Sequence, residues 1–454
     1  MAQKLLRLLR TNIFLVLICL LFLVTRLYKI SEIPGSVYWD EASIGYNAYS
    51  VLTTGRDEWG EFMPLHFRAF GEFKLPVYIY SVAISESLFG MNVFAVRFPA
   101  VIFGLLSIVG LYLVINKITK LKIVALLSSF LFSVTPWFFI FSRTGYEAVS
   151  GLAFFIWAIY FLIKSIEEKN YLVLSTILFV GSTYSYNSFR ILTPVVLGLG
   201  LLYFLVRKHY GVVFMSALIL LASMFPLYKL FKQDSGLSRL QSVKSTSNIV
   251  SNYIKNYSPY YLFIEGDTNP RSQVPYKSQL YFTDSIFLIL GVLYILKSKN
   301  PKLYLVLCLL LIAPIPAAIT KENPHALRSI LMSPIFSVIS ALGIYYLSKS
   351  SKLLIVIVVG AYLISFGNYY YKFNTEYNDL SKSAWQFEYK DIFEKQKEGC
   401  VSDEFAQPYI FALYYQKVNP SDFIATRELN PVSDWGFSTV KSFGKYTFPK
   451  ICKN

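Results

Sequence analysis

The sequence predicts an all-α polytopic membrane protein with a small folded appendage at its C-terminus. Hydrophobic residues make up 55% of the 454 residues and charged residues only 15%, whereas soluble domains are about 25% charged. Apolar runs that approach the roughly 20 residues needed to cross a bilayer recur along most of the chain. From residue 372 onward the charges rise, and aromatic residues alternate with Lys, Asp and Pro. This last segment is therefore predicted to form a small α/β or α+β domain.

Eleven membrane-spanning helices are predicted from the apolar runs. The first follows a basic N-terminus with Lys4, Arg7 and Arg10. No small-residue cleavage site follows it, so we interpret it as an uncleaved helix rather than a signal peptide. The predicted spans are 12–30, 93–116, 122–141, 148–164, 170–187, 190–206, 211–231, 281–297, 302–319, 328–347 and 352–371.

The charges of the short loops predict the orientation of these helices. If the basic N-terminus is cytoplasmic, every short inside loop is basic, as the positive-inside rule requires. The basic residues of these loops are Lys117, Lys120, Lys122, Lys164, Lys169, Arg207, Lys208, Lys297, Lys299, Lys302, Lys349 and Lys352. The net charge of +16 is scattered between apolar segments, which favours a topology signal over nucleic-acid binding.

Three long segments then lie on the outer side: 31–92, 232–280 and 372–454. Within the first, residues 75–89 are apolar but short and contain Glu86, so we expect an interfacial or re-entrant helix. Residues 41–53 also show apolar positions at helical spacing. We expect a transmembrane domain over 1–371, with 31–92 as its catalytic loop, and an extracytoplasmic domain over 372–454.

The cysteines and histidines give little chemistry. Cys19 and Cys308 lie inside apolar segments and are interpreted as packing residues, whereas Cys400 and Cys452 could pair if the tail is outside. No metal-ligand spacing occurs, and the chain has only three histidines. No cofactor is predicted; a divalent metal is left open but is not indicated.

Polar residues of unusual kinds gather at the predicted outer face. A carboxylate there can act as a general base, and cations can stabilise a leaving phosphate. Tyrosine and tryptophan offer faces to a sugar ring and suit the membrane interface. An enzyme that acts on a sugar linked to a lipid phosphate requires all three kinds of side chain: carboxylates, cations and aromatic rings. The candidate residues are Asp40, Glu41, Asp57, Glu58, Lys74, Arg143, Tyr146, Glu147, Tyr186, Arg190, His325 and Arg328.

The runs VYWDEASIGYNAYSVLTTGRDEWGEFMPLHFRAFGEFKLPVYIY and LFGMNVFAVRFPAVIFGLL resemble the GT-C glycosyltransferases. The branch is the one related to protein O-mannosyltransferases and the lipid A aminoarabinose transferase (glycosyltransferase family 39/83-like). The resemblance is strongest over 31–150 and weaker through NPHALR. It implies that Asp40 is the catalytic carboxylate, completed by Glu41, and that Lys74 contacts phosphate. Glu147 stands where the aminoarabinose transferases have an aspartate.

The resemblance also implies an isoprenyl-phosphate sugar donor and inversion at the anomeric carbon. We therefore predict a hexosyl- or pentosyltransferase that acts on a lipid, glycan or protein at the outer face of the cytoplasmic membrane, with no nucleic-acid partner. Asp40 and Glu41 are the predicted catalytic residues. The predicted phosphate contacts are Lys74, His325 and Arg328. The predicted substrate contacts are Asp57, Glu58, Arg143, Tyr146, Glu147, Tyr186 and Arg190.

A purely structural role is also consistent with each of these residues. Asp40 suits a helix N-cap, Glu41 a first-turn charge, and Lys74 a snorkelling lysine. Arg143 and Arg190 could form ion pairs with Glu147 or face lipid phosphates. The structural roles for the remaining residues are a solvated turn for Asp57 and Glu58, a helix cap for His325, a headgroup anchor for Arg328 and an interfacial belt for Tyr186.

Two further functions are consistent with a membrane protein of this kind. A transporter or flippase of lipid-linked sugars is expected to show internal repeats and broken or charged helices near the bilayer midplane. The sequence shows no obvious repeat, and its charges fall at the outer ends of the predicted helices. A catalytically inactive homologue is the second possibility, against which the intact Asp40, Glu41 and Lys74 argue.

Overall fold

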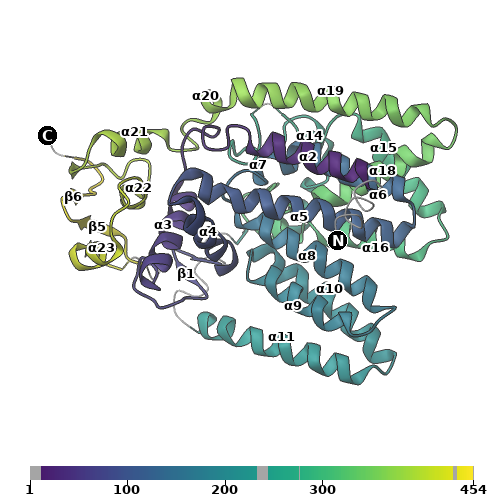
Figure 1. The fold of residues 1–454 in the computed structure, drawn as a ribbon, viewed down its shortest axis with the longest axis horizontal. Coiled ribbons are helices and arrows are strands. Elements are labelled where there is room, and N and C mark those ends of the chain that lie inside the picture. Colours follow the sequence, from purple (N-terminus) through teal and green to yellow (C-terminus); the bar gives the residue numbers. More distant parts are fainter. Residues whose placement is uncertain (1–11, 233–243, 276, 433–436, 453–454) are drawn as a thin grey trace, which may run out of the picture.

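A bundle of helices and a small domain at one end make up the structure, a computed structural model that describes residues 12–232, 244–275, 277–432 and 437–452. Most helices of the bundle run along the long axis of the molecule, and the C-terminal domain lies at the left end in this view (Figure 1). The basic N-terminal residues Lys4, Arg7 and Arg10 lie outside the described residues. The predicted fold class, a helical polytopic membrane protein with a small C-terminal sheet region, is confirmed.

Each of the eleven predicted spans coincides with a helical segment. Six segments of the described chain are long and apolar enough to cross a membrane: α5 (Val93–Thr119), α8 (Glu147–Ser165), α10 (Asn187–Val206), α11 (Tyr210–Phe231), the run Pro301–Ala318 and α19 (Leu353–Thr375). Shorter apolar helices are α2 (Ile13–Leu27), α6 (Lys122–Val134), α9 (Tyr171–Thr183) and α18 (Met332–Ser348). The span predicted at 281–297 corresponds to α15 (Asp284–Lys297).

Prolines and turns divide some of the predicted spans. The segment 122–141 is interrupted at Thr135, after which α7 (Pro136–Phe141) begins with proline at its first position. Proline has no N–H to donate and disfavours helical backbone in the preceding residue, so the helix ends there. The span predicted at 302–319 is likewise three pieces, η1 (Pro301–Leu303), α16 (Tyr304–Ile312) and α17 (Ile315–Ala318).

Small residues allow two of the central helices to approach closely. A Cβ atom added at Gly291 of α15 would lie 1.9 Å from the carbonyl oxygen of Ile339 in α18. A Cβ atom added at Gly343 of α18 would lie 2.1 Å from the carbonyl oxygen of Phe287. Glycine at both positions is therefore required by the packing, as is common where membrane helices touch.

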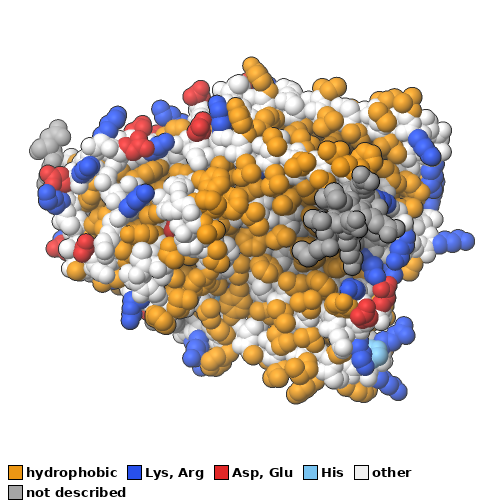
Figure 2. All heavy atoms as spheres, viewed as in Figure 1, with side chains coloured by type: hydrophobic (Ala, Val, Ile, Leu, Met, Phe, Trp, Pro, Cys, Tyr) orange, Lys and Arg blue, Asp and Glu red, His pale blue; other side chains and the backbone are white. Residues whose placement is uncertain are grey.

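The outside of the bundle is largely apolar. Hydrophobic side chains cover the bundle between the C-terminal domain and the right edge of the molecule, along which Lys and Arg side chains gather (Figure 2). In the most apolar 18-residue stretch of α11 only 11% of the residues are buried within the protein, and in that of α19 only 17%. Exposed apolar helices of this kind suit contact with lipid chains.

The first long loop folds into surface helices and a hairpin. Helix α3 (Trp39–Thr54) contains the segment expected at 41–53, and α4 (Pro76–Phe89) matches the expected interfacial helix. Between them β1 (Phe67–Arg68) pairs antiparallel with β2 (Phe73–Lys74). The later loop segment contains α13 (Ile249–Lys255) and α14 (Pro259–Phe263); its residues 233–243 and 276 lie outside the described residues.

The C-terminal segment contains a mixed four-stranded sheet and short helices. Its strands are β3 (Gly399–Cys400), β4 (Glu428–Leu429), β5 (Val440–Phe443) and β6 (Tyr446–Thr447), in the order β3-β6-β5-β4. Strand β3 is parallel to β6, and the remaining neighbouring strands pair antiparallel. The helices are α20 (Tyr377–Ser381), α21 (Phe387–Lys395), α22 (Pro408–Tyr415) and α23 (Pro420–Thr426).

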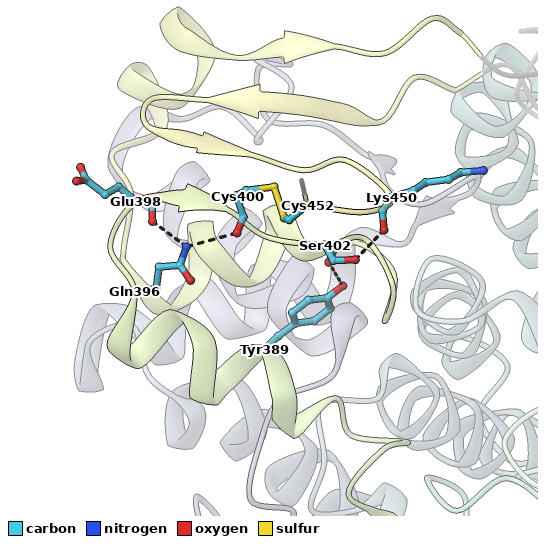
Figure 3. Close-up of a disulfide and its surroundings, with 7 residues drawn as sticks. All are labelled: Tyr389, Gln396, Glu398, Cys400, Ser402, Lys450 and Cys452. Atoms are coloured by element: carbon cyan, nitrogen blue, oxygen red, sulfur yellow. Dashed lines mark hydrogen bonds between the residues drawn. A yellow bond between two sulfur atoms is a disulfide. The ribbon is translucent and has the colours of Figure 1, made fainter. Parts of the chain in front are cut away.

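A disulfide between Cys400 and Cys452 closes the C-terminal segment on itself (Figure 3). Beside it, the hydroxyl of Tyr389 donates a hydrogen bond to the carbonyl of Ser402 at 3.0 Å. The Ser402 hydroxyl in turn donates to the carbonyl of Lys450 at 2.8 Å. These bonds tie the end of the described chain to α21.

The C-terminal segment also packs against the first loop. One hydrophobic cluster joins residues of α3 and α4 to residues of α21, α22 and β5. The backbone N–H of Trp39 donates a hydrogen bond to the Gln386 side chain at 3.0 Å, and Arg427 donates to the carbonyl of Glu58 at 2.7 Å. The start of α3, where Asp40 and Glu41 lie, is therefore held by the C-terminal segment.

Candidate active site

The first turn of α3 directs Asp40 towards the hairpin. The Lys74 ammonium, at the end of β2, donates to the Asp40 carboxylate and lies 3.5 Å from a carboxylate oxygen of Glu72. The Lys74 side chain is 4% exposed, whereas that of Asp40 is 25% exposed. Burial favours the neutral form of Lys74, but the nearby carboxylates of Asp40 and Glu72 outweigh it and raise its pKa above the usual lysine value. Lys74 is thus held in place as a cation, and the Asp40 side chain beside it is partly exposed.

Glu41 points the other way, into the protein. The Arg97 guanidinium donates two hydrogen bonds to its carboxylate, at 3.0 and 2.9 Å, and the Gly145 N–H donates a third at 2.6 Å. The side chains of Glu41 and Arg97 have no exposed surface. Arg97 also donates to the carbonyls of Ile30, Pro34 and Ser36. This network joins α3 to α5 and to the segment that leads into α3.

A cavity of about 320 Å³ opens beside Asp40, and we refer to it as the first cavity. Part of its wall is apolar, with Ile191 of α10, Phe231 of α11 and Ile319 among the lining residues. The first cavity therefore combines charged groups with an apolar wall next to the exposed helices α10 and α11. It brings together seven of the residues predicted from the sequence: Asp40, Lys74, Tyr146, Glu147, Tyr186, Arg190 and Arg328.

Arg190 shares this cavity with Glu147, whose charge acts on it, but makes no salt bridge with it. Its Nε and Nη2 atoms are buried and have no hydrogen-bond partner, and it forms no ion pair with any described residue. Its guanidinium carbon lies 6.0 Å from the ring centroid of Phe231. A buried charge without a partner is strongly unfavourable, so an anionic ligand here would relieve it.

Glu147 and Tyr146 also line the first cavity. The backbone N–H of Leu75 donates to the Glu147 carboxylate at 3.4 Å, which joins the start of α8 to the end of the hairpin. The Tyr146 ring packs against that of Tyr38, with centroids 5.5 Å apart. Tyr186 lines the cavity from the residue before α10.

A second cavity, of about 270 Å³, is also lined by Asp40. The second cavity adds Trp39 and Phe70 from the first loop and Arg271 from the loop before α15. Asp40 therefore stands at the boundary between two neighbouring spaces. Six residues line both cavities: Tyr38, Asp40, Glu72, Tyr146, Leu327 and Arg328.

His325 and Arg328 both line the second cavity. Arg328 lines both cavities and donates to Thr320 at 2.9 Å and to Glu322 at 3.2 Å. His325 lines the second cavity but not the first, and its imidazole nitrogens lie 3.5 Å from Glu322 and 3.8 Å from Asp267. All three predicted phosphate contacts, Lys74, His325 and Arg328, therefore lie beside carboxylates of the protein.

Three further predicted substrate contacts, Arg143, Asp57 and Glu58, lie away from both cavities. Arg143 is buried and caps the end of α2, because it donates only to backbone carbonyls. These carbonyls are those of Thr25, Tyr28, Lys29 and Ile33. Asp57 is buried in a turn and accepts N–H bonds from Trp59 and Glu61, each at 2.9 Å.

Glu58, next to Asp57, is also buried. Its backbone N–H donates to Asn47 of α3 at 3.0 Å. Burial, reinforced by the charge of Asp57, raises the pKa of the Glu58 carboxyl to about 8. A group with this pKa is protonated at neutral pH.

Sequence reasoning missed Glu72, Trp39 and Arg271 as cavity residues. Trp39 and Glu72 stand next to recognised motif residues, so proximity along the chain could have indicated them. Arg271 lies in a polar loop with no motif around it, and only the fold brings it to Asp40. No group of three or more His, Cys, Asp or Glu side chains suited to a metal ion occurs among the described residues.

Comparisons with known proteins identify the fold of the chain. Residues 74–228 match the family model described as dolichyl-phosphate-mannose-protein mannosyltransferase. The fold is similar to that of the oligosaccharyltransferase AglB from Archaeoglobus fulgidus, solved in complex with an inhibitory peptide and a dolichol-phosphate. The TM-score is 0.53 at 11% identity, over 90% of this chain and 64% of that one. The protein therefore has the GT-C fold, and the resemblance predicted from the sequence is confirmed.

Two further solved structures also match this chain. The apo form of the same archaeal oligosaccharyltransferase gives a TM-score of 0.53 at 13% identity, over 88% of this chain and 63% of that one. ArnT from Cupriavidus metallidurans gives 0.49 at 12% identity, over 78% and 63%. The chain thus spans about three fifths of the length of the oligosaccharyltransferase. No curated protein sequence matches.

Proposed function

We propose that this protein is an inverting glycosyltransferase that uses a sugar linked to a polyprenyl phosphate. The observation that carries the proposal is the position of the Asp40–Lys74 pair at the boundary of two cavities, with the unpaired Arg190 in the first of them. Transfer of a sugar from a lipid phosphate requires a base for the acceptor hydroxyl and cations that stabilise the leaving phosphate. Asp40 would be the base, and Lys74 and Arg190 the cations.

The first cavity suits the donor. Its phosphate would lie between Lys74 and Arg190, because guanidinium and ammonium groups both bind phosphate oxygens with charge-assisted hydrogen bonds. The isoprenyl chain would pass along Ile191, Phe231 and Ile319 towards the exposed apolar surface of α10 and α11. Charged and apolar walls in one cavity match a ligand with a charged head and a lipid tail.

Asp40 is placed for proton abstraction. An acceptor hydroxyl that enters from the second cavity would give its proton to the Asp40 carboxylate as its oxygen bonds to the anomeric carbon. The bond from that carbon to the phosphate oxygen breaks in the same displacement, which inverts the configuration. The electron pair leaves with the polyprenyl phosphate, whose charge Lys74 and Arg190 stabilise. Glu41 contributes indirectly, because its bonds to Arg97 and Gly145 hold the turn that carries Asp40.

Two features support an outer-face location. The Cys400–Cys452 disulfide lies in the C-terminal segment, and disulfides persist mainly in oxidising compartments. Lys and Arg side chains gather at the opposite end of the bundle (Figure 2), and basic loops favour the cytoplasmic side. We therefore propose a cytoplasmic-membrane enzyme whose active site and C-terminal domain are outside.

Replacing Asp40 by Asn tests the proposed reaction. Purified full-length protein in lipid nanodiscs is supplied with synthetic polyprenyl-phosphate sugars and a cell-envelope extract as acceptor, and polyprenyl phosphate release is measured. We expect Asp40→Asn to lower the rate by about 10²–10⁴-fold, the usual contribution of a general base. Asp379→Asn is the matched control, because Asp379 is an exposed carboxylate in α20. Equal rates for wild type and Asp40→Asn would overturn the role of Asp40.

A further inference from the structure

Arg271 is a further cation near Asp40, in the cavity that Arg190 does not line. It lines the second cavity and not the first. No described residue forms an ion pair with it, and its side chain contacts Asn269 and the rings of Tyr38 and Trp39. The carboxylates that line the same cavity are engaged elsewhere: Asp40 and Glu72 contact Lys74, and Glu322 contacts Arg328.

The Arg271 side chain is held in place by its surroundings. Its Nε atom donates to the Asn269 side chain at 3.4 Å, and its backbone N–H donates to the same oxygen at 3.0 Å. Its guanidinium carbon lies 4.8 Å from the Tyr38 ring centroid and 5.9 Å from that of Trp39. The preceding loop residue, Pro270, accepts a hydrogen bond from Tyr377 at 2.8 Å.

These contacts leave the two terminal nitrogens of the guanidinium without a hydrogen-bond acceptor among the described residues. A planar guanidinium with both ends available binds phosphate or carboxylate in a bidentate manner. Ser272 and Lys321 line the same cavity and add a hydroxyl and a second cation. The second cavity therefore has the chemistry of an oxyanion site next to the proposed base.

We infer that the acceptor is anionic, with a phosphate or carboxylate group that binds Arg271 while its hydroxyl faces Asp40. The inference rests on the proposed function and defines the acceptor's chemical class. Two separate cationic positions are needed because donor and acceptor are both negatively charged, and like charges at one site would repel. Arg190 with Lys74 serves the donor, and Arg271 serves the acceptor.

The cations assigned to the two substrates come from different parts of the chain. Lys74 and Arg190 of the first cavity lie within residues 74–228, which match the mannosyltransferase family model. Arg271 and Lys321 of the second cavity lie beyond the matched segment. The acceptor side is thus built largely from parts of the chain outside the match.

The test uses full-length protein in nanodiscs that is first saturated with undecaprenyl phosphate, so that the donor phosphate position is filled. Glucose 1-phosphate, glucuronate and glucose are then titrated by calorimetry. We expect the two anionic probes to bind more tightly than glucose, and the better of them identifies phosphate or carboxylate. Arg271→Gln should weaken anionic binding at least about 10-fold, which corresponds to about 1.4 kcal/mol.

Arg207→Gln is the matched control, because Arg207 is exposed at the end of α10; it should leave all three titrations unchanged. Arg271→Lys keeps the charge but not the planar fork and should retain part of the affinity. The inference is overturned if glucose binds as well as the anionic probes, if the anionic probes bind only to protein without undecaprenyl phosphate, or if folded Arg271→Gln binds them like wild type. Failure of undecaprenyl phosphate to bind wild-type protein would instead count against the proposed donor.

Discussion

Asp40 and Glu41 are neighbours in the first turn of α3, yet their carboxylates have different surroundings. Asp40 contacts Lys74 at the edge of two cavities and remains partly exposed, whereas Glu41 is enclosed with Arg97 and accepts three hydrogen bonds. A helix turns by about 100° per residue, so consecutive side chains point in different directions. Two adjacent carboxylates can therefore have different roles: Asp40 lies at the cavities where the chemistry is proposed, and Glu41 holds the backbone.

The largest expected effect on stability comes from removing the buried charge of Glu41. Glu41→Gln leaves Arg97 buried without its counter-ion, and breaking a buried pair in this way costs about 3–5 kcal/mol. We expect a lower midpoint of thermal unfolding in detergent, measured by intrinsic fluorescence. Asp40→Asn should shift the midpoint far less, because Asp40 is partly exposed. Equal shifts for the two variants would contradict the division of roles.

Lys74→Gln tests the role of the cation beside Asp40. It removes the cation that faces both Asp40 and the proposed donor phosphate. Hydrogen bonds to charged groups are worth about 1.5–3 kcal/mol, so affinity for undecaprenyl phosphate should fall by about 10–100-fold. Calorimetric titration of the lipid phosphate into the nanodisc-bound variant measures this change. An unchanged affinity would leave Lys74 only a structural role, as the ion-pair partner of Asp40 and Glu72.

Glu58 offers a third carboxylate of the same loop, buried without an ion-paired cation among the described residues. Because its folded pKa is raised to about 8, the native state keeps a proton that the unfolded chain loses above about pH 4.3. Stability therefore falls as pH rises from about 4.3 to about 8. Glu58→Gln should raise the unfolding midpoint relative to wild type at pH 8, with a smaller gain at pH 5. A gain that is independent of pH would contradict a neutral Glu58.

The membrane bundle was largely predictable from sequence, because the bilayer imposes a length and a composition on every spanning helix. The first-loop residues Asp40 and Lys74 were predictable from their motif, and they do lie together. The roles of Glu41 and Arg143 were not, since their partners are distant in sequence: Arg97 is 56 residues from Glu41, and Thr25 is 118 residues from Arg143.

Loops account for the rest of what could not be predicted. Arg271 reaches the site only because the loop before α15 folds back over Tyr38 and Trp39. His325 was predicted as a donor-phosphate ligand from a motif, but the fold places it in the second cavity beside Asp267 and Glu322. Local patterns predict which residue types gather at one face, whereas long-range packing decides which cavity each one lines.

The most direct test of the central claim measures transfer rate and donor affinity together for Asp40→Asn. If Asp40 is the base, the rate of sugar transfer falls by about 10²–10⁴-fold, while affinity for undecaprenyl phosphate and the unfolding midpoint stay close to wild type. If folded Asp40→Asn transfers sugar at the wild-type rate, Asp40 is not the base, and the proposed division between Asp40 and Glu41 is wrong.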